Sequence, residues 1–242
     1  MLLRDRQPEL MDDPDLPRDQ HEHALAGLAR LNRFSGVSRA TFAHVRRHAK
    51  KIGHRPFRIL DVASGSGDVP LSWLASAKRE GLNLELTMSD ISPVAVEQQQ
   101  CLANSLGVKT HSLQLDCLKS DLPDGFDMVT CSLFMHHLDD HQVFRLLQSM
   151  QSATDNAILI CDLHRSRFNL AMVSLAAHLL TRSHVVHTDS ALSVRAAYTG
   201  NEFKQISEKA LARPVKIRPS FPCRFIATFD EKVIPEPIAA FA

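Results

Sequence analysis

The feature that most constrains the fold is the stretch ILDVASGSGDVP at residues 59–70, where an apolar run passes one acid and ends in small residues. The run predicts a buried β-strand, and the small residues predict a tight turn that leads into a helix. Ligands of open α/β sheets bind at such turns, beyond the carboxyl ends of the strands. The turn could therefore hold the pyrophosphate of a dinucleotide, hold another nucleotide-like ligand, or only reverse the chain.

Strand and helix patterns alternate along the rest of the chain. Apolar, β-rich segments predict strands at residues 57–62, 82–88, 110–116, 126–134 and 157–163. Helical patterns occur at residues 69–80, 93–106, 140–152 and 199–211, and a hairpin is expected over 214–230. This alternation predicts an α/β fold built on a doubly wound parallel sheet.

Segments of different composition flank this domain. Residues 1–20 are acidic and broken by prolines, so we expect a flexible N-terminal arm. Residues 21–55 carry two helical patterns, which predict an N-terminal helical cap. The main domain then covers residues 56–230, and residues 231–242 form a C-terminal tail.

Charge and cysteine spacing indicate which partners and bonds to expect. The formal net charge is +1 and the basic residues are scattered, so we expect no nucleic acid partner. The 5 cysteines are widely spaced and never form a Cys-x-x-Cys pair, which indicates free thiols and predicts neither disulfides nor a metal site. Free thiols are typical of a reducing compartment, so we predict a cytoplasmic protein. The N-terminal residues show no signal-peptide pattern, and no transmembrane segment is expected.

Pro70 argues against a dinucleotide. The nicotinamide fingerprint Gly-x-Gly-x-x-Gly, counted from Gly65, needs a third glycine at position 70, where this chain has proline. What remains is Asp61 followed by small residues at positions 63–67. Backbone N–H groups at a helix start can receive a carboxylate and Asp61 can receive an ammonium group, so the turn suits the zwitterionic end of S-adenosylmethionine.

Two further acids stand where the nucleoside of such a ligand would lie. Asp90 ends the second predicted strand, where a carboxylate can accept from both ribose hydroxyls, and Ser92 occupies the capping position before Pro93. Asp116 ends the third predicted strand, where it can accept from the adenine amino group beside the backbone N–H of Cys117. The alternative for Asp116 is a turn in which it bonds only its own backbone.

These stretches, together with FDMVTCSLFMHHL at residues 126–138, resemble class I S-adenosylmethionine-dependent methyltransferases. The DVASGSGD stretch is most similar to UbiE-type enzymes, which methylate quinone precursors, and to related bacterial small-molecule methyltransferases. The resemblance covers about residues 57–163. It implies a Rossmann-like, seven-stranded sheet with an antiparallel last strand, a helical lid insertion at about residues 164–198, and a contact between Ser132 and the cofactor.

The predicted cofactor is S-adenosyl-L-methionine. Its contacts are expected from the turn and from the ends of the second, third and fourth strands. The predicted cofactor-binding residues are Asp61, Ala63, Ser64, Gly65, Ser66, Gly67, Asp90, Ile91, Asp116, Cys117 and Ser132. Ala63 departs from the resemblance, because many members of the class have glycine at this position.

Candidates for the chemistry follow the fourth and fifth strands. Methyl transfer needs in-line positioning, and a base helps where the acceptor is a phenol or an acidic carbon. Two interpretations of the pair His136-His137 are open. In one, a histidine acts as a catalytic base, and His137 is the better candidate. In the other, one histidine packs under the loop and the other points into solvent. His164, with Arg165 beside it, and Tyr198 are the other catalytic candidates.

Residues 168–180 are apolar on nearly every side, yet too short to cross a bilayer, which takes ~20 apolar residues. We expect them to form an apolar lid over an apolar acceptor. The N-terminal arm and the helices over residues 24–51 are expected to close over the cofactor from the other side. The polar residues Asp189, Ser193 and Arg195, expected in a loop, could line the same pocket.

We therefore predict an enzyme that transfers a methyl group from S-adenosylmethionine to oxygen or carbon of a small, rather apolar acceptor that is quinone-, polyketide- or isoprenoid-like. A homodimer is left open. The alternatives are a nicotinamide-dependent oxidoreductase and a non-catalytic binding module on the same fold. Methylation of nitrogen in nucleic acid or protein is disfavoured, because residues 131–134 read CSLF where the amino-methylating enzymes of the class carry an Asn/Asp-Pro-Pro-aromatic clamp.

Overall fold

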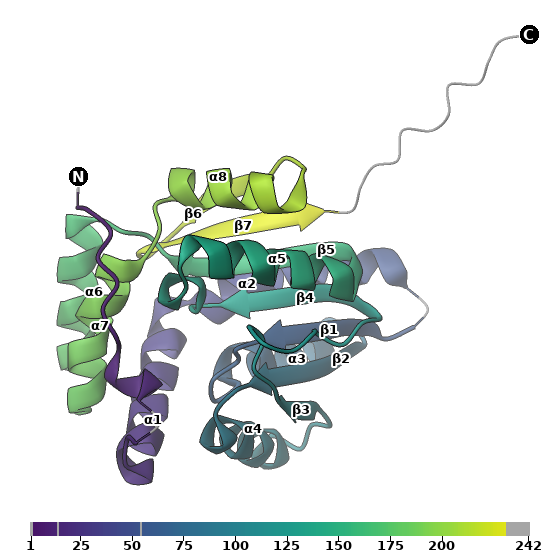
Figure 1. Ribbon diagram of the computed structural model, residues 1–242. Helices are drawn as coiled ribbons and strands as arrows, with labels where there is room; N and C mark the ends of the chain where they lie inside the picture. The colour runs from purple at the N-terminus through teal and green to yellow at the C-terminus, as the bar shows by residue number, and fades with distance from the viewer. Residues whose placement is uncertain (1, 14, 54, 231–242) are drawn as a thin grey trace, which may run out of the picture.

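The computed structural model describes residues 2–13, 15–53 and 55–230 of the chain. Its centre is one seven-stranded sheet in the order β3-β2-β1-β4-β5-β7-β6 (Figure 1). The strands are β1 (Phe57–Val62), β2 (Leu84–Asp90), β3 (His111–Gln114), β4 (Phe126–Ser132), β5 (Thr154–Leu163), β6 (Lys216–Ser220) and β7 (Arg224–Asp230). β1 to β5 pair in parallel, and β7 runs antiparallel to β5 and β6. The predicted seven-stranded sheet with an antiparallel last strand is confirmed.

Helices cover both faces of the sheet. One face carries α5 (Asp140–Ala153) and α8 (Gly200–Leu211), and the other carries α2 (Val37–Ile52), α3 (Asp68–Arg79) and α4 (Pro93–Ser105). Successive side chains of a strand point to opposite faces, so Leu60 packs with α5 and α8 whereas Ile59 packs with α2 and α3. This two-sided burial explains why the strands read as continuous apolar runs, and it is the doubly wound arrangement predicted from the sequence.

Side-chain caps set where several helices begin. Ser92 caps α4, as predicted, and Thr199 with Glu202 forms the predicted capping box of α8. Asp139 and Gln142 form a second capping box at the start of α5. The side-chain oxygens at these positions accept from backbone N–H groups that no helical carbonyl can reach.

A third group of helices stands at the carboxyl ends of the parallel strands, on the left of Figure 1. It consists of α1 (Arg18–Ser35), α6 (Arg167–Leu180) and α7 (His184–Ala196). These helices share a small core that includes Ala24, Ala177 and Val185. The sequence predicts a loop for α7, but Ser183 caps it and its apolar residues are buried against α1 and α6, so packing favours a helix. Among the described residues, no helix has the length and apolar character needed to cross a membrane.

The N-terminal arm lies along this helical group. The sequence predicts a flexible arm over residues 1–20, whereas in the structure residues 2–13 run beside α6 and α7 toward α1 (Figure 1). Arg4 donates to the carbonyl of Ala196 at 2.7 Å, and the backbone N–H of Leu10 donates to Asp189 at 2.9 Å. The arm is held because it pairs polar groups that α7 would otherwise leave unpaired. The predicted C-terminal tail, residues 231–242, lies outside the described residues.

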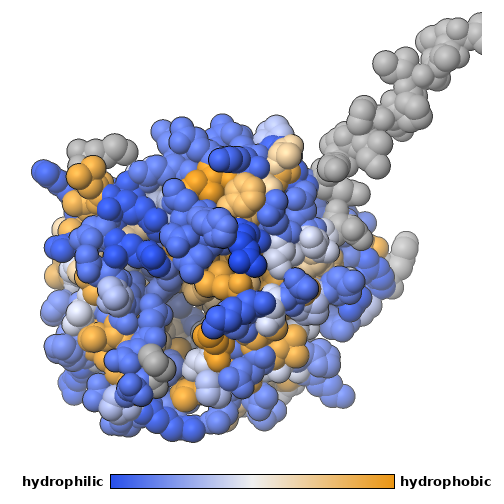
Figure 2. Space-filling view, in the orientation of Figure 1, coloured by the Kyte–Doolittle hydropathy of each residue, from blue (hydrophilic) through white to orange (hydrophobic). Residues whose placement is uncertain are grey.

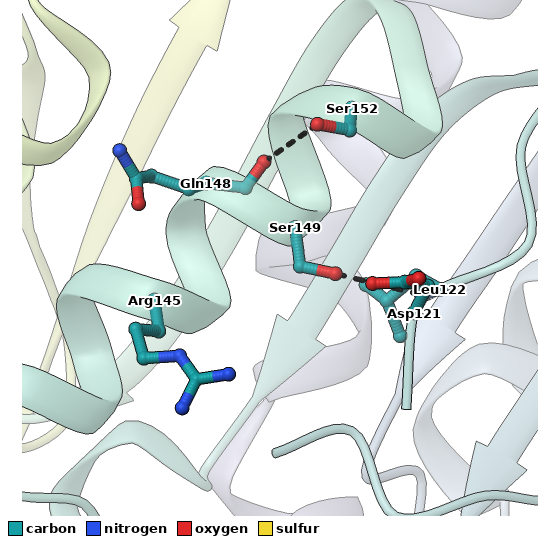
Figure 3. A pocket seen from close by; sticks show the side chains of 6 residues that line it. All are labelled: Asp121, Leu122, Arg145, Gln148, Ser149 and Ser152. Carbon is teal, nitrogen blue, oxygen red and sulfur yellow. Dashed lines mark hydrogen bonds between the residues drawn. The ribbon is translucent and has the colours of Figure 1, made fainter. Parts of the chain in front are cut away.

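Two hollows mark the surface. The face in Figure 2 is largely hydrophilic and is hollowed between the helical group of α1, α6 and α7 and the sheet. Figure 3 shows another hollow, on α5 and the loop before β4, lined by Asp121, Leu122, Arg145, Gln148, Ser149 and Ser152. This second hollow adjoins the amino end of β4, away from the edge at which folds of this kind bind ligands. We assign no site to it.

Candidate functional site

The glycine turn joins β1 to α3 at the carboxyl edge of the sheet. Ala63, Gly65 and Gly67 have positive φ angles of 53°, 54° and 76°. Glycine adopts this conformation freely, whereas alanine adopts it only with strain. The backbone N–H of Gly67 donates to the carbonyl of Ser64, and that of Ser64 donates to Ser89, both at 2.9 Å. The predicted strand, turn and helix are therefore present, with Ala63 in a strained position.

The two glycines differ in their surroundings. A Cβ atom on Gly67 would lie 2.8 Å from the Sδ atom of Met88, so packing requires glycine there. A Cβ atom on Gly65 would have Leu25 as its nearest neighbour, at 3.9 Å. Gly65 therefore presents open backbone, and a ligand could lie against it.

Asp61 is buried at the end of β1, with 1% of its surface exposed. The hydroxyl of Thr130 donates to its carboxylate at 2.5 Å. Burial raises the pKa of Asp61 to about 7, although hydrogen bonds from Thr130 and Ser64 act in the opposite direction. Among the described residues, no lysine or arginine forms an ion pair with Asp61.

Asp90, at the end of β2, faces the same turn. Its carboxylate accepts from the backbone N–H groups of Gly65 at 2.8 Å and Ser92 at 3.0 Å. Burial raises the pKa of Asp90, and these two hydrogen bonds partly offset the effect. Since Ser92 caps α4, Asp90 is free to face the turn. Asp61 lies in the last part of β1, just before the turn, and Asp90 is bonded to Gly65 within it, so the structure brings both acids to one loop.

Asp116 has the local contacts of a turn residue. Its carboxylate accepts from the backbone N–H of Leu118 at 3.0 Å and pairs with Lys119 at 3.1 Å. This is the alternative that the sequence leaves open for Asp116. Cys117 packs against the core beneath α5, and burial raises the pKa of its thiol to about 12. Contact of either residue with an adenine ring stays a prediction.

Strained backbone lies beside Ser132, which ends β4. Leu133 has a φ of 59°, and its N–H donates to the carbonyl of Cys161 at 2.8 Å. Leu133 and Ala63 thus hold unfavourable conformations directly after the two central strands. Strain of this kind clusters at functional sites. Ile91, with 60% of its surface exposed, follows β2 at the same edge of the sheet.

Three further residues, not predicted from the sequence, form hydrogen bonds at the glycine turn. The amide of Asn32 on α1 donates to Asp68 at 3.1 Å, and Ser66 donates to the other oxygen of Asp68 at 3.1 Å. The amide of Gln99 on α4 donates to the carbonyl of Gly65 at 2.9 Å. α1 therefore covers the turn. Asp68 was visible in the DVASGSGD stretch, but no local pattern identified Asn32 or Gln99.

The turn after β4 contains a buried histidine-carboxylate pair. The Nδ1 atom of His136 lies 2.6 Å from Oδ1 of Asp162, and the backbone N–H of His136 donates to Oδ2 at 3.0 Å. His136 is 3% exposed and Asp162 is 1% exposed. His136 is thus the packed histidine that the sequence leads us to expect, and the acid at the end of β5 fixes its ring.

His137 is covered by the N-terminal arm and does not point into solvent. Its Nδ1 atom lies 3.1 Å from Asp12, and its Nε2 atom lies 3.9 Å from Glu9. Burial lowers the pKa of His137, but the hydrogen bond with Asp12 and the charges of Glu9 and Asp12 outweigh burial and raise the pKa to about 9. At neutral pH His137 is therefore a cation, which does not suit the role of free base predicted for it.

His164 and Arg165 have different surroundings although they are adjacent. His164 is half-buried, and burial together with the charge of Arg165 lowers its pKa, so its ring is neutral near pH 7. Arg165 is buried, donates to the carbonyl of Leu2 at 2.8 Å and pairs with Glu202 at 2.6 Å. The expectation that Arg165 faces the acceptor as a free cation is therefore not met.

Tyr198 is engaged in structural contacts. Its hydroxyl lies 2.9 Å from Asp140 and 3.1 Å from the carbonyl of Leu138, and Arg4 lies over its ring at 3.7 Å. Burial raises the pKa of Tyr198. A catalytic role for its hydroxyl stays a prediction, and these contacts argue against it.

The polar residues of α7 also serve the arm. Asp189 accepts from Leu10, and the hydroxyl of Ser193 donates to Glu9 at 2.7 Å. Arg195 is exposed. Asp189 and Ser193 thus hold the arm, whereas the sequence leads us to expect that all three residues line an acceptor pocket.

Residues 59–156 match the family model described as a methyltransferase domain. Over 100 residues the chain is 31% identical to the ubiquinone/menaquinone biosynthesis C-methyltransferase UbiE of Rickettsia bellii, a region that covers 38% of this chain and 40% of that protein. Over 94 residues it is 29% identical to the demethylmenaquinone methyltransferase of Deinococcus radiodurans, covering 38% of this chain and 37% of that protein. The match thus spans about two fifths of the length of these curated relatives.

Solved structures share the fold over most of the chain. The plantazolicin methyltransferase BpumL, in complex with a substrate analogue and SAH, has a TM-score of 0.65 at 19% identity and is covered over 91% of both chains. The magnesium protoporphyrin IX methyltransferase ChlM of Synechocystis PCC 6803, with bound SAH, has a TM-score of 0.55 at 13% identity, covering 94% of this chain and 89% of that one. At such identities these similarities show the fold alone.

Proposed function

Since the chain carries a methyltransferase domain on the class I, S-adenosylmethionine-dependent fold, we propose that it transfers a methyl group from S-adenosylmethionine to oxygen or carbon of a small, rather apolar molecule. One observation carries the proposal: the glycine turn that follows Asp61 on β1 presents open backbone at Gly65, whose N–H donates to the carboxylate of Asp90 at 2.8 Å. The resemblance recognised in the sequence is confirmed by the family model and by the strand order.

The proposed contacts fix the orientation of the cofactor in this turn. N–H groups near the start of α3 would bind its carboxylate, Asp61 would bind its ammonium group, and Asp90 would accept hydrogen bonds from the ribose hydroxyls. S-adenosylmethionine supplies the electrophilic methyl group when bound. The protein's contribution is to hold donor and acceptor in line and to keep water away.

The proposal of an apolar acceptor is supported by α6. Phe168, Leu175 and Leu179 are 66%, 58% and 73% exposed, and their spacing places them on one side of the helix. Apolar side chains exposed together indicate a binding surface. The names of the similar proteins refer to quinone biosynthesis, magnesium protoporphyrin IX and plantazolicin, which are small-molecule chemistries of different kinds.

His164 is the best remaining candidate for a base. It follows β5 at the edge of the sheet where the turn lies, and its lowered pKa keeps the ring neutral near pH 7. A neutral imidazole can take the proton of a phenol or an acidic carbon as the methyl group arrives.

We also propose a reducing compartment such as the cytoplasm, because all five cysteines are free thiols.

Calorimetry separates the proposal from its alternatives. The full chain is titrated with S-adenosylmethionine, S-adenosylhomocysteine and NADH, and we expect binding of the first two only. Binding of NADH alone would overturn the proposal in favour of an oxidoreductase. A screen with methyl-labelled cofactor then compares apolar phenols, quinols and polyketides with very polar acceptors, and labelling of the polar set alone would contradict the apolar acceptor.

A further inference from the structure

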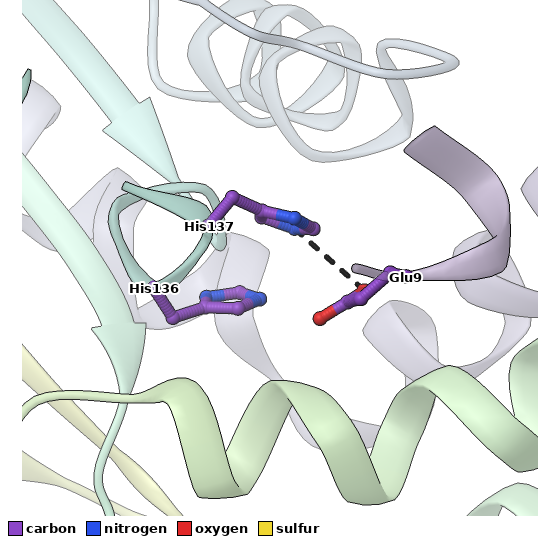
Figure 4. Close-up of side chains that lie close together, drawn as sticks. All are labelled: Glu9, His136 and His137. Atoms are coloured by element: carbon purple, nitrogen blue, oxygen red, sulfur yellow. Dashed lines mark ion pairs between the residues drawn. The ribbon is translucent and has the colours of Figure 1, made fainter. Parts of the chain in front are cut away.

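The N-terminal arm brings an acid to the histidine pair that follows β4. Ligand atoms of Glu9, His136 and His137 all lie within 4.8 Å of one another. Figure 4 shows the two imidazole rings side by side, both turned toward the carboxylate of Glu9. The ring centroids of His136 and His137 are 4.4 Å apart. Residues separated by more than a hundred positions in sequence thus form one cluster of nitrogen and oxygen donors.

We propose that Glu9, His136 and His137 form a binding site for one divalent transition-metal ion of the zinc type. Two histidines and one glutamate are an established ligand set for zinc, with a fourth position left for water or for an oxygen atom of a bound molecule. Tetrahedral ligands at roughly 2.0–2.2 Å from zinc lie about 3.4 Å apart. The distances between the three ligand atoms would therefore shorten by about 1 Å when the ion binds. The cysteine spacing gives no sign of this site, because only the fold brings Glu9 to the two histidines.

Each histidine is held by a carboxylate through its other nitrogen. The Nδ1 atom of His136 lies 2.6 Å from Asp162, and the Nδ1 atom of His137 lies 3.1 Å from Asp12. A metal-binding histidine nearly always donates its second ring N–H to such a partner, because the partner fixes the ring and leaves the first nitrogen free to bind the ion. Both histidines have this arrangement, and at His137 the ion would take the place of the proton that the Nε2 atom carries at neutral pH.

Glu9 is fixed in the same way. The hydroxyl of Ser193 donates to Oε1 of Glu9 at 2.7 Å, while Oε2 is the atom that faces His137 at 3.9 Å. Glu9 is 8% exposed although it belongs to an N-terminal arm. A buried carboxylate with one oxygen bonded and the other turned to two imidazole rings is suited to bind a cation.

The surrounding charge also favours a cation. Asp12, Asp162 and Asp189 add to the negative charge of Glu9. Within the described part of the chain, the ion pairs of Glu9, Asp12 and Asp162 are with the two histidines alone. The nearby guanidinium groups of Arg4 and Arg6 donate to backbone carbonyls of residues 136–138. A divalent ion would balance acids that no lysine or arginine neutralises.

Zinc titration of the full chain without a histidine tag tests the site. After treatment with a chelator, calorimetry with ZnCl₂ and no S-adenosylmethionine should show one equivalent bound. Glu9→Gln and His137→Asn should each weaken the affinity by at least about tenfold, and Asp12→Asn by roughly 10- to 100-fold. Because the cofactor is absent, failure of this experiment leaves the methyl-transfer proposal untouched.

A second histidine pair provides the matched control. His178 on α6 stacks on His187 of α7 with ring centroids 4.2 Å apart, and His178 is exposed. His178→Ala should leave zinc affinity unchanged. Thermal unfolding shows whether each variant folds, and at one zinc concentration the rise in midpoint should be equal in the wild type and His178→Ala but smaller in Glu9→Gln. No stoichiometric binding, or a zinc affinity that Glu9→Gln leaves unchanged, would overturn the proposal.

Discussion

The backbone N–H of Gly65 donates to the carboxylate of Asp90 at 2.8 Å and so joins the turn after β1 to the end of β2, 25 residues later in the chain. Parallel pairing of β1 with β2 sets this contact, because the carboxyl ends of both strands meet at one edge of the sheet. The contact holds the turn against the end of β2 and places the acid where ribose hydroxyls are proposed to bind.

Asp90→Asn should weaken binding of S-adenosylmethionine. The change removes the charge that strengthens hydrogen bonds from two ribose hydroxyls, and bonds to a charged group contribute about 1.5–3 kcal/mol. We expect the dissociation constant to rise roughly 10- to 100-fold by calorimetry. Asp124→Asn, at an exposed position in the loop before β4, is the control and should bind normally. Normal affinity in Asp90→Asn would remove this residue from the cofactor site.

Gly65→Ala and Gly67→Ala should separate ligand binding from folding. A Cβ atom at Gly67 meets Met88 at 2.8 Å, so Gly67→Ala should lower the free energy of unfolding by roughly 2–3 kcal/mol. Gly65 has open space around it, so Gly65→Ala should cost only about 1 kcal/mol for its positive φ angle. Gly65→Ala should still lose cofactor affinity, because the new methyl group occupies the face proposed for the ligand. Urea unfolding and calorimetry on both variants give the comparison, and equal destabilisation would contradict it.

Asp61 should make stability depend on pH. Its pKa is raised from 3.8 to about 7 by burial, so between these values the folded protein binds a proton that the unfolded chain has released. The free energy of unfolding, relative to that of Asp61→Asn, should therefore fall by up to roughly 4 kcal/mol as the pH rises through this window. Above about pH 7 it should level off. Denaturant unfolding of both proteins at several pH values measures the difference. A difference that does not change with pH would show that Asp61 keeps an ordinary pKa.

The same residue predicts a pH effect of opposite sign on cofactor affinity. Only the ionised carboxylate attracts an ammonium group, so S-adenosylmethionine should bind more weakly as the pH falls below about 7. Asp61→Asn should bind weakly throughout and lose this dependence. Calorimetry across the range provides the measurement, and an equally steep profile in the variant would assign the effect to another group.

Tyr198→Phe should mainly affect stability. The change removes a hydroxyl that lies 2.9 Å from Asp140 and 3.1 Å from the carbonyl of Leu138. Loss of such a hydrogen bond costs about 1 kcal/mol. Chemical unfolding measures this loss, and turnover of the same variant tests the catalytic role predicted from the sequence. A large fall in turnover with unchanged stability would restore Tyr198 as a catalytic residue.

His164→Ala should lower turnover with acceptors that lose a proton, while cofactor affinity stays unchanged. A general base contributes roughly 10²- to 10⁴-fold. Wild-type activity should rise with pH as His164 loses its proton, below its ordinary pKa, and should be constant at neutral pH. The pH profile of the variant should lack this rising part. His141→Ala, an exposed histidine on α5, is the control. Unaltered turnover in His164→Ala would remove it from the mechanism.

The glycine turn and the acids beside it, where the cofactor is proposed to bind, could be predicted from the sequence. Small residues after a strand, with acids at the ends of the next two strands, are local signals, and the strand order follows from regular alternation of strands and helices. Asp61, Gly65 and Asp90 were therefore identified in advance, and the structure brings them together. Asn32 and Gln99 were not, because their contacts depend on how α1 and α4 pack.

The surroundings of the histidine pair depended on tertiary structure. The sequence suggested one packed and one solvated histidine in the pair His136-His137, and a flexible arm that closes over the cofactor, with no contact between the arm and either histidine foreseen. Only the fold brings Glu9 and Asp12 onto His137, because α7 offers polar groups that the arm satisfies. A side chain's pKa, its freedom and its use as a ligand depend on neighbours distant in sequence, and those neighbours are set by packing. The sequence by itself determined the sheet and the cofactor turn, and the tertiary structure decided what each histidine can do.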